Sequence, residues 1–135
     1  KIAEKELDVE YLGGVKLIKF NPDKIPNPTV VKRAKHVVTE NDRVLKAKEH
    51  LLKDEIVKFG KLMIESHNSY SSDFEASTSD VDEIVKKSIE CGALGARLTG
   101  GGFGGFTVSL IEENNFSKWY DTITKYYPED KIFEV

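Results

Sequence analysis

The stretch "ARLTGGGFGGFTVSL", Ala96 to Leu110, decides the fold, and it contains five glycines within six positions. An apolar segment lies on each side of the glycines. After them, Phe106, Val108 and Leu110 alternate with small polar residues, which is the two-residue period of a β-strand. Two strands joined by a short loop pair antiparallel. The stretch therefore predicts a hairpin of "ARLT" and "FTVSLI", connected by a glycine loop over residues 100–105.

The segment before this hairpin is predicted to form three helices. Asn27-Pro28 begins the first, because Asn caps helix N-termini and Pro suits the first helical position. A second helix begins at Asp54. A third has Ser79 as its N-cap, with Asp82 three residues on, and ends at Gly92. Their apolar residues recur at helical spacing, among them Val30, Val31, Ala34, Val37, Val38, Val44, Leu45, Ile56, Val57, Leu62, Met63, Val81, Ile84, Val85 and Ile89.

The two ends of the chain carry weaker patterns. "KIAEKELDVEYLGG" is typical of the tail of a helix that stops near Gly13-Gly14, so we expect the chain to be part of a longer protein. A short strand is expected over 15–20, a helix over 114–127 and a last strand in "KIFEV". We expect residues 1–27 to form a helix tail and connecting segment, and residues 28–135 to form one domain.

The order of these elements predicts the fold class. Helices, strand, glycine loop, strand, helix and strand follow one another, and the helices need one face of the sheet to cover. This order favours an α+β fold in which helices cover an antiparallel sheet, of the split βαβ (ferredoxin-like) type.

Composition excludes several classes of function. The chain has 135 residues, 39% of them hydrophobic, and a net charge of −3, so no general basic field would recruit nucleic acid or anionic lipid. No apolar run is long enough to span a membrane. Cys91 is the single cysteine, so no internal disulfide can form. A cytoplasmic location is expected, because a reducing compartment suits an unpaired thiol.

The glycine run itself admits two explanations. Gly100, Gly102 and Gly105 match G-x-G-x-x-G, but a strand follows where a dinucleotide-binding motif needs a helix. A P-loop needs Gly-Lys-Ser/Thr at its end, and a protein-kinase loop needs a downstream H-R-D motif; both are absent. A hairpin turn explains two glycines, and each further glycine costs roughly 0.5–1 kcal/mol relative to Ala. Close approach of the loop to a ligand or another domain is therefore favoured over a bare turn.

Three linked motifs resemble those of the GHMP small-molecule kinases, specifically galactokinases. "GARLTGGGFGGFTVSL" resembles their third signature motif. "VVKRAKHVVTENDRV" resembles their R-A-x-H-x-x-x-E-N-x-R segment, through Arg33, Ala34, His36, Glu40, Asn41 and Arg43. "FGKLMIESHNSYSSDFEASTSDVDEIV" resembles their F-G-x-L-M-x-E-S-H segment and its continuation. The resemblance covers residues 28–111 and implies a GHMP kinase C-terminal domain over 28–135.

The resemblance also implies a function for the whole protein. Galactokinases use ATP and Mg²⁺ to phosphorylate the anomeric hydroxyl of D-galactose. Their catalytic Asp and Arg, sugar-binding acids and Gly/Ser-rich phosphate loop lie in the N-terminal part, and no residue here matches them. The resemblance therefore implies no catalytic or metal-binding residue in this chain, and it implies that the N-terminal half of the same kinase is the partner. Phosphoryl transfer depends on positioning and charge stabilisation, so we expect the chain alone to be inactive.

Candidate site residues fall into two groups. The loop on the nucleotide-phosphate side comprises Thr99, Gly100, Gly101, Gly102, Gly104 and Gly105. Ser66, His67 and Arg97 are candidates to face the cleft, although Arg97 fits a strand-edge salt bridge equally well. The histidines His36 and His67 are expected to be packed on helices and hydrogen-bonded rather than to bind metal.

A further polar group and two departures from the galactokinase pattern concern structure. Glu40, Asn41 and Arg43 are expected to form a buried hydrogen-bonded network. Residues 70–74 read Tyr-Ser-Ser-Asp-Phe, where galactokinases have Leu-Arg-Asp-Asp-Tyr, so a role for that Arg-Asp pair is in doubt. Phe106 replaces a small Cys, and we expect it to point into the core of the sheet.

Three other functions stay open on the sequence. A non-catalytic galactokinase paralogue could bind sugar and ATP and act on a regulator. A related GHMP kinase could act on another small substrate. A stand-alone ligand-binding α+β module is the third alternative.

Overall fold

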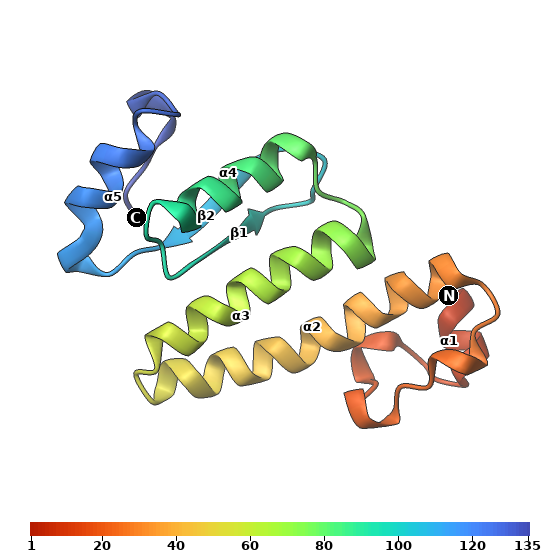
Figure 1. Ribbon diagram of the computed structural model, residues 1–135. Helices are drawn as coiled ribbons and strands as arrows, with labels where there is room; N and C mark the ends of the chain where they lie inside the picture. The colour runs from red at the N-terminus through yellow and green to blue at the C-terminus, as the bar shows by residue number, and fades with distance from the viewer.

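Two long helices form the centre of the structure, a computed structural model that describes all residues 1–135. α2 (Pro28–Leu52) and α3 (Ile56–Ser69) lie side by side and antiparallel (Figure 1). Asn27 caps α2 as predicted, since its Oδ1 accepts the N–H groups of Thr29 and Val30. Asp54, the predicted start of the second helix, instead lies in the turn with φ 55°, and α3 begins two residues later.

A two-stranded antiparallel hairpin packs against α3. β1 (Gly95–Thr99) pairs with β2 (Phe106–Leu110), with Ala96 opposite Ser109 and Leu98 opposite Thr107. The predicted α+β class, with helices covering an antiparallel sheet, is confirmed. α4 (Ser79–Glu90) covers one face of the hairpin, and Ser88 Oγ on it donates to Ser109 Oγ at 2.7 Å. The cap of α4 is Thr78, one residue before the predicted Ser79.

α3 and β1 touch through their backbones. A Cβ on Gly60 of α3 would lie closer than 3.0 Å to the backbone of Leu94, the residue just before β1. A Cβ on Gly95 of β1 would lie closer than 3.0 Å to the backbone of Gly60. Real Cβ contacts are never this short, so the crossing requires glycine on both sides. The two glycines hold the strand that leads into the glycine loop directly against α3.

The predicted orientation of β2 is wrong. Phe106, expected in the core, is 67% exposed, and Val108 is also exposed. The covered face of the hairpin carries Ala96 and Leu98 of β1, so the register places Thr107 and Ser109 on that face instead. A strand shows the same alternation whichever face is buried, so only the packing of α4 decides the orientation.

Two further predicted strands are absent. Residues 15–20 form turns that include the 3₁₀ segment Leu17–Lys19. The C-terminal "KIFEV" overlaps the end of the 3₁₀ segment Glu129–Lys131 and continues without a strand. Neither segment has a strand beside it to pair with, and an unpaired strand leaves its backbone groups unsatisfied. Phe20 instead packs against Ala3, Ile25 and Ala34.

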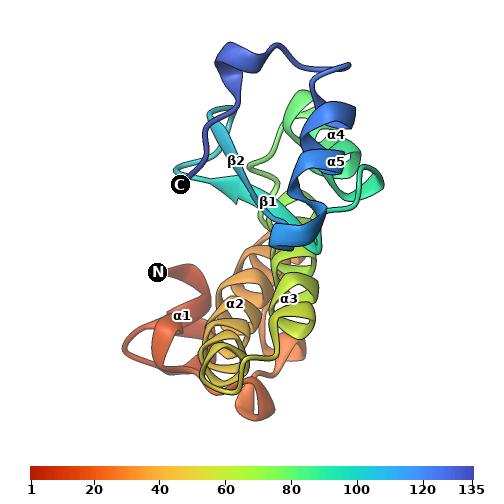
Figure 2. The same cartoon turned by 90° about the vertical axis from the view of Figure 1, so that its left-hand side faces the viewer.

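The chain ends are small helical units that pack on neighbouring helices. α1 (Ile2–Leu7) ends at Asp8, well before the predicted stop at Gly13-Gly14, and lies beside α2. α5 (Phe116–Ile123) falls inside the helix predicted over 114–127 and packs beside α4, on the same side of the hairpin (Figure 2). Trp119 of α5 donates its indole N–H to the Ser88 carbonyl at 3.1 Å. No helix is both long and apolar enough to cross a bilayer.

Candidate functional site

The glycine loop has an unusual backbone. Gly100, Gly102, Gly104 and Gly105 all have positive φ, between 91° and 121°, and so does Phe103 at 59°. The N–H of Phe103 donates to the Ala76 carbonyl at 2.7 Å, which ties the middle of the loop to the segment between α3 and α4. The five glycine N–H groups donate no hydrogen bond within the chain. The loop therefore presents a row of free backbone donors on a fixed anchor.

Only one loop glycine is required by packing within this chain. A Cβ on Gly102 would lie 2.5 Å from the Ala76 carbonyl oxygen and 2.8 Å from the Tyr70 hydroxyl. A Cβ on Gly100, Gly101 or Gly104 would have no atom within 4 Å. The positive φ values of Gly100 and Gly104 account for glycine at those two positions, so only Gly101 has no internal reason to lack a side chain, as expected where another group approaches.

Arg97 forms a salt bridge at the base of the loop. Its Nη1 lies 3.1 Å from Glu40 Oε1, and the same carboxylate accepts the Ser66 hydroxyl and, at 2.8 Å, the Nε of Arg43. Burial on its own raises the pKa of Glu40, but the hydrogen bonds from Ser66 and Arg43 and the two arginine charges outweigh it, so its pKa is lowered. This arrangement (Glu40, Arg43, Ser66 and Arg97) is called the Glu40 cluster below.

The predicted polar network is therefore correct for Glu40 and Arg43 and wrong for Asn41. The Asn41 amide donates to the Gly13 carbonyl at 3.0 Å, on another side of α2. Ser66 and Arg97, two of the three candidate cleft residues, meet at Glu40. The sequence carried no signal for this meeting, because Arg97 lies 57 residues from its partner.

His67, the third candidate, faces the sheet rather than the Glu40 cluster. It is only 5% exposed, and its Nδ1 accepts the N–H of Leu98 at 3.3 Å. Because Nδ1 accepts, the proton of the neutral ring is on Nε2, which lies 3.1 Å from Asp82 Oδ1 but is too poorly aligned for a hydrogen bond. Burial lowers the pKa of His67, and the Asp82 carboxylate only partly opposes this effect.

His36 is a second packed histidine, as predicted. Its Nδ1 lies 3.1 Å from the Ser69 hydroxyl, and its ring packs against Tyr70 and Phe74. Burial lowers its pKa. Neither histidine is available to a ligand from solution.

The segment that departs from the galactokinase pattern forms its own hydrogen bonds. Residues Tyr70–Phe74 make a π-helical turn, in which the Ser71 hydroxyl donates to Asp82 Oδ2 at 2.8 Å. Ser77 donates to the other oxygen of Asp82 at 2.6 Å. Asp82, which the sequence indicated only as a capping residue, thus ties α4 to this turn and to Ser77, next to the anchor of the glycine loop at Ala76.

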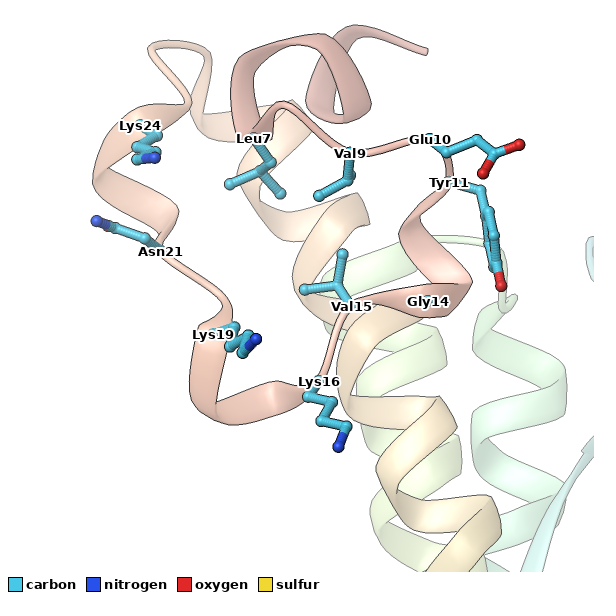
Figure 3. Close-up of a pocket in the computed structure, with 10 residues that line it drawn as sticks. All are labelled: Leu7, Val9, Glu10, Tyr11, Gly14, Val15, Lys16, Lys19, Asn21 and Lys24. Atoms are coloured by element: carbon cyan, nitrogen blue, oxygen red, sulfur yellow. The ribbon is translucent and has the colours of Figure 1, made fainter.

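Two surface hollows lie outside the glycine loop. The larger, about 570 Å³, lies among the N-terminal turns and is lined by Leu7, Val9, Val15 and three lysines among others (Figure 3). It contains none of the predicted site residues, and its walls are exposed turns. The second, about 270 Å³, lies between α2, α3 and the open face of the hairpin, and includes Arg97, Ser66 and Val108. No group of three His, Cys, Asp or Glu side chains could hold a metal ion.

Comparison with known families identifies this architecture. Residues 47–129, which include α3, α4, the hairpin and α5, match the family described as GHMP kinases C terminal. The chain belongs to this family. The match includes two of the three motifs, and the relatives below, which cover nearly the whole chain, confirm the resemblance.

Relatives of known function agree with this membership. The chain is 37% identical to a galactokinase of Enterococcus faecalis over 135 residues, and 40% identical to one of Fusobacterium nucleatum over 131 residues. A crystal structure of Lactococcus lactis galactokinase complexed with galactose superposes with a TM-score of 0.86 at 32% identity and covers 96% of this chain. The chain spans about a third of the length of these relatives, 34–35% in each case.

Proposed function

We propose that this chain is the C-terminal third of an ATP-dependent galactokinase that phosphorylates D-galactose at its anomeric hydroxyl. The identity to curated galactokinases and the similarity to a galactose-bound structure support this assignment. We infer that residues 28–135 are its C-terminal domain and that residues 1–27 connect it to what precedes. We place the kinase in the cytoplasm, where Cys91 stays unpaired.

The role proposed for this chain is to close the phosphate end of the active-site cleft. The observation that carries it is the row of five glycine N–H groups without an acceptor. Free N–H groups of successive backbone residues in a turn form concave anion sites, and ATP phosphates are anions of the appropriate charge. Loop residues 99–105 would lie against the phosphates and the phosphate-binding loop of the N-terminal half.

Magnesium is held elsewhere in this proposal. ATP-dependent kinases use Mg²⁺, but the acidic side chains of this chain form no metal-binding group. The residues here therefore do not fit the ion, and the N-terminal half supplies its ligands together with the catalytic groups. The isolated chain, given ATP and galactose, should show no ADP release above buffer.

The decisive variant in the full-length kinase is Gly101→Ala. Inside this chain the new methyl group meets nothing within 4 Å, and the φ of Gly101 lies outside the strained positive region. A fall in kcat/KM for ATP therefore reports on a group that approaches from outside the chain. We expect a loss of at least tenfold, or about 1.4 kcal/mol of transition-state stabilisation, with an unchanged Tm.

Gly102→Ala is the matched control, because its methyl group would clash with Ala76 inside the chain. It should lower the Tm as well as the activity. If Gly101→Ala leaves the kinetics for ATP unchanged, the loop is scaffolding and its proposed role is wrong. If the wild-type kinase releases no ADP with galactose, the galactokinase assignment itself fails.

A further inference from the structure

Phe103 has a conformation that its side chain does not favour. Four non-glycine residues have positive φ: Asp8, Asp54, Glu75 and Phe103. Left-handed backbone is tolerated by Asp, whose short polar side chain bonds locally, but it is a genuine outlier for a bulky aromatic residue. The hydrogen bond from its N–H to the Ala76 carbonyl, at 2.7 Å, holds Phe103 in this state.

The ring gains nothing within the chain in return. Phe103 is 77% exposed, and no aromatic partner packs against it. The neighbouring Gly104 has open space where a side chain would be. The surrounding glycines also have positive φ, and a glycine at position 103 would adopt this conformation with less strain than Phe103 does. Strained residues of this kind persist where they serve function.

The strand that follows the loop exposes further apolar side chains. Phe106 is 67% exposed, and Val108 continues the same face of β2 towards the hollow beside α2 and α3. The one charged residue on this face of the hairpin, Arg97 opposite Val108, already forms a salt bridge with Glu40. A protein surface of matching apolar character covers these apolar side chains better than a nucleotide does.

We propose that Phe103 is a positioning residue whose ring enters an apolar pocket in the part of the kinase outside this chain, and thereby fixes the glycine loop over the phosphates. The proposal rests on the proposed function, since that part accounts for about two thirds of each relative. A loop of five glycines has many accessible conformations. The Ala76 hydrogen bond anchors its backbone on one side, and a docked ring would anchor it on the other.

Tryptophan substitution in the full-length kinase tests the docking without relying on activity. Phe103→Trp keeps a large ring at the site, and its emission can be compared with that of Phe133→Trp, a matched position that is 68% exposed and outside the loop. After subtraction of the wild-type signal, we expect the indole emission of Phe103→Trp to be blue-shifted and at least threefold less quenched by acrylamide than that of Phe133→Trp. Equal quenching at the two positions would overturn the proposal.

Kinetics in the same protein test the positioning role. Phe103→Gly removes the ring and relieves the backbone, and we expect its kcat/KM for ATP to fall at least tenfold. Phe103→Leu should retain most of the activity, because an apolar side chain can still enter the pocket. Phe133→Gly should retain wild-type kinetics. If Phe103→Gly is as active as the wild type, Phe103 has no positioning role.

Two other outcomes assign the ring to a different occupant and overturn the proposal. Shielding that appears only when ATP is added indicates contact with the nucleotide. Shielding that appears only as protein concentration rises indicates a second copy of the chain. If the wild type does not phosphorylate galactose, the proposed function fails, while the quenching experiment still reports whether the ring is docked.

Discussion

Substitution of Glu40 by Gln tests how the base of the glycine loop is held. The Glu40 carboxylate connects three elements: it accepts from Arg43 within α2, from Ser66 on α3 and from Arg97 on β1. Gln has nearly the same size and keeps one acceptor oxygen. Glu40→Gln therefore removes the charge and leaves two arginines facing a neutral amide.

The expected loss of stability follows from the burial of the cluster. The side chain of Glu40 is 20% exposed, that of Arg43 14% and that of Arg97 35%. Breaking a fully buried ion pair costs about 3–5 kcal/mol, whereas exposed pairs are worth about 0–1 kcal/mol. For these partly buried groups we expect a loss of about 2 kcal/mol, which lowers the Tm by roughly 6 °C.

A double-mutant cycle in the full-length kinase isolates the salt bridge to β1. Glu40→Gln, Arg97→Gln and the double variant are unfolded in urea at neutral pH, and we expect a coupling energy of about 1 kcal/mol between the two sites. Arg43→Gln paired with Glu40→Gln is the matched cycle within one helix. A coupling energy of zero for Glu40 and Arg97 would refute the conclusion that this salt bridge holds the loop base.

The pH dependence gives a second check on the same cluster. The pKa of Glu40 is lowered in the folded protein from 4.5, so the unfolded state binds the proton more readily. Its contribution to stability is therefore present above the unfolded pKa and is lost as pH falls through the folded one. The stability difference between wild type and Glu40→Gln should shrink below about pH 4.5. A constant difference across this range would mean that the charge of Glu40 does not stabilise the fold.

Two further predictions concern the packing around β1. Gly60→Ala places a methyl group against the backbone of Leu94, which cannot yield as a flexible side chain would. Thermal melts should therefore show a loss of at least about 2 kcal/mol in stability. Gly13→Ala is the control and should lose little stability, because its methyl group faces only the Tyr11 ring and the Asn41 amide. Burial lowers the pKa values of His36 and His67 from 6.5, so the unfolded state binds more protons below that pH. Stability should therefore fall as pH decreases from about 6.5, which urea titrations at several pH values can check. A His36→Gln, His67→Gln double variant should show a flatter dependence of stability on pH.

Local signals in the sequence predicted the helices and the hairpin well. The Asn27-Pro28 start of α2 and the helical spacing of apolar residues in α3 and α4 depend on interactions within a few residues, and the structure confirms them. The starts of α3 and α4 moved by one or two residues, because Asp54 lies in the turn with positive φ and Thr78, rather than Ser79, accepts the N–H of Val81. The α+β class followed from the order of these elements.

The candidate site was predicted in composition but not in arrangement. The glycine run and Arg97 could be singled out from the sequence, yet the salt bridge to Glu40 joins residues 57 positions apart. His67 was grouped with Ser66 because the two are adjacent in sequence, but neighbouring helical residues point in different directions. The anchor at Ala76 is a backbone carbonyl, which no residue type reveals.

The sequence by itself determined the family, the helices and the existence of a glycine loop between two strands, because these depend on local periodicity, caps and contiguous motifs. Tertiary structure alone decided which face of β2 is buried, since alternation is the same for either face. It also decided that residues 15–20 and 131–135 form no strand, because a strand needs a partner that the rest of the fold must supply. For Phe103, sequence and tertiary structure each decided one part. Its place in the motif is visible in the sequence. Its strained backbone and exposed ring depend on the hydrogen bond that anchors the loop to Ala76, in the segment between α3 and α4.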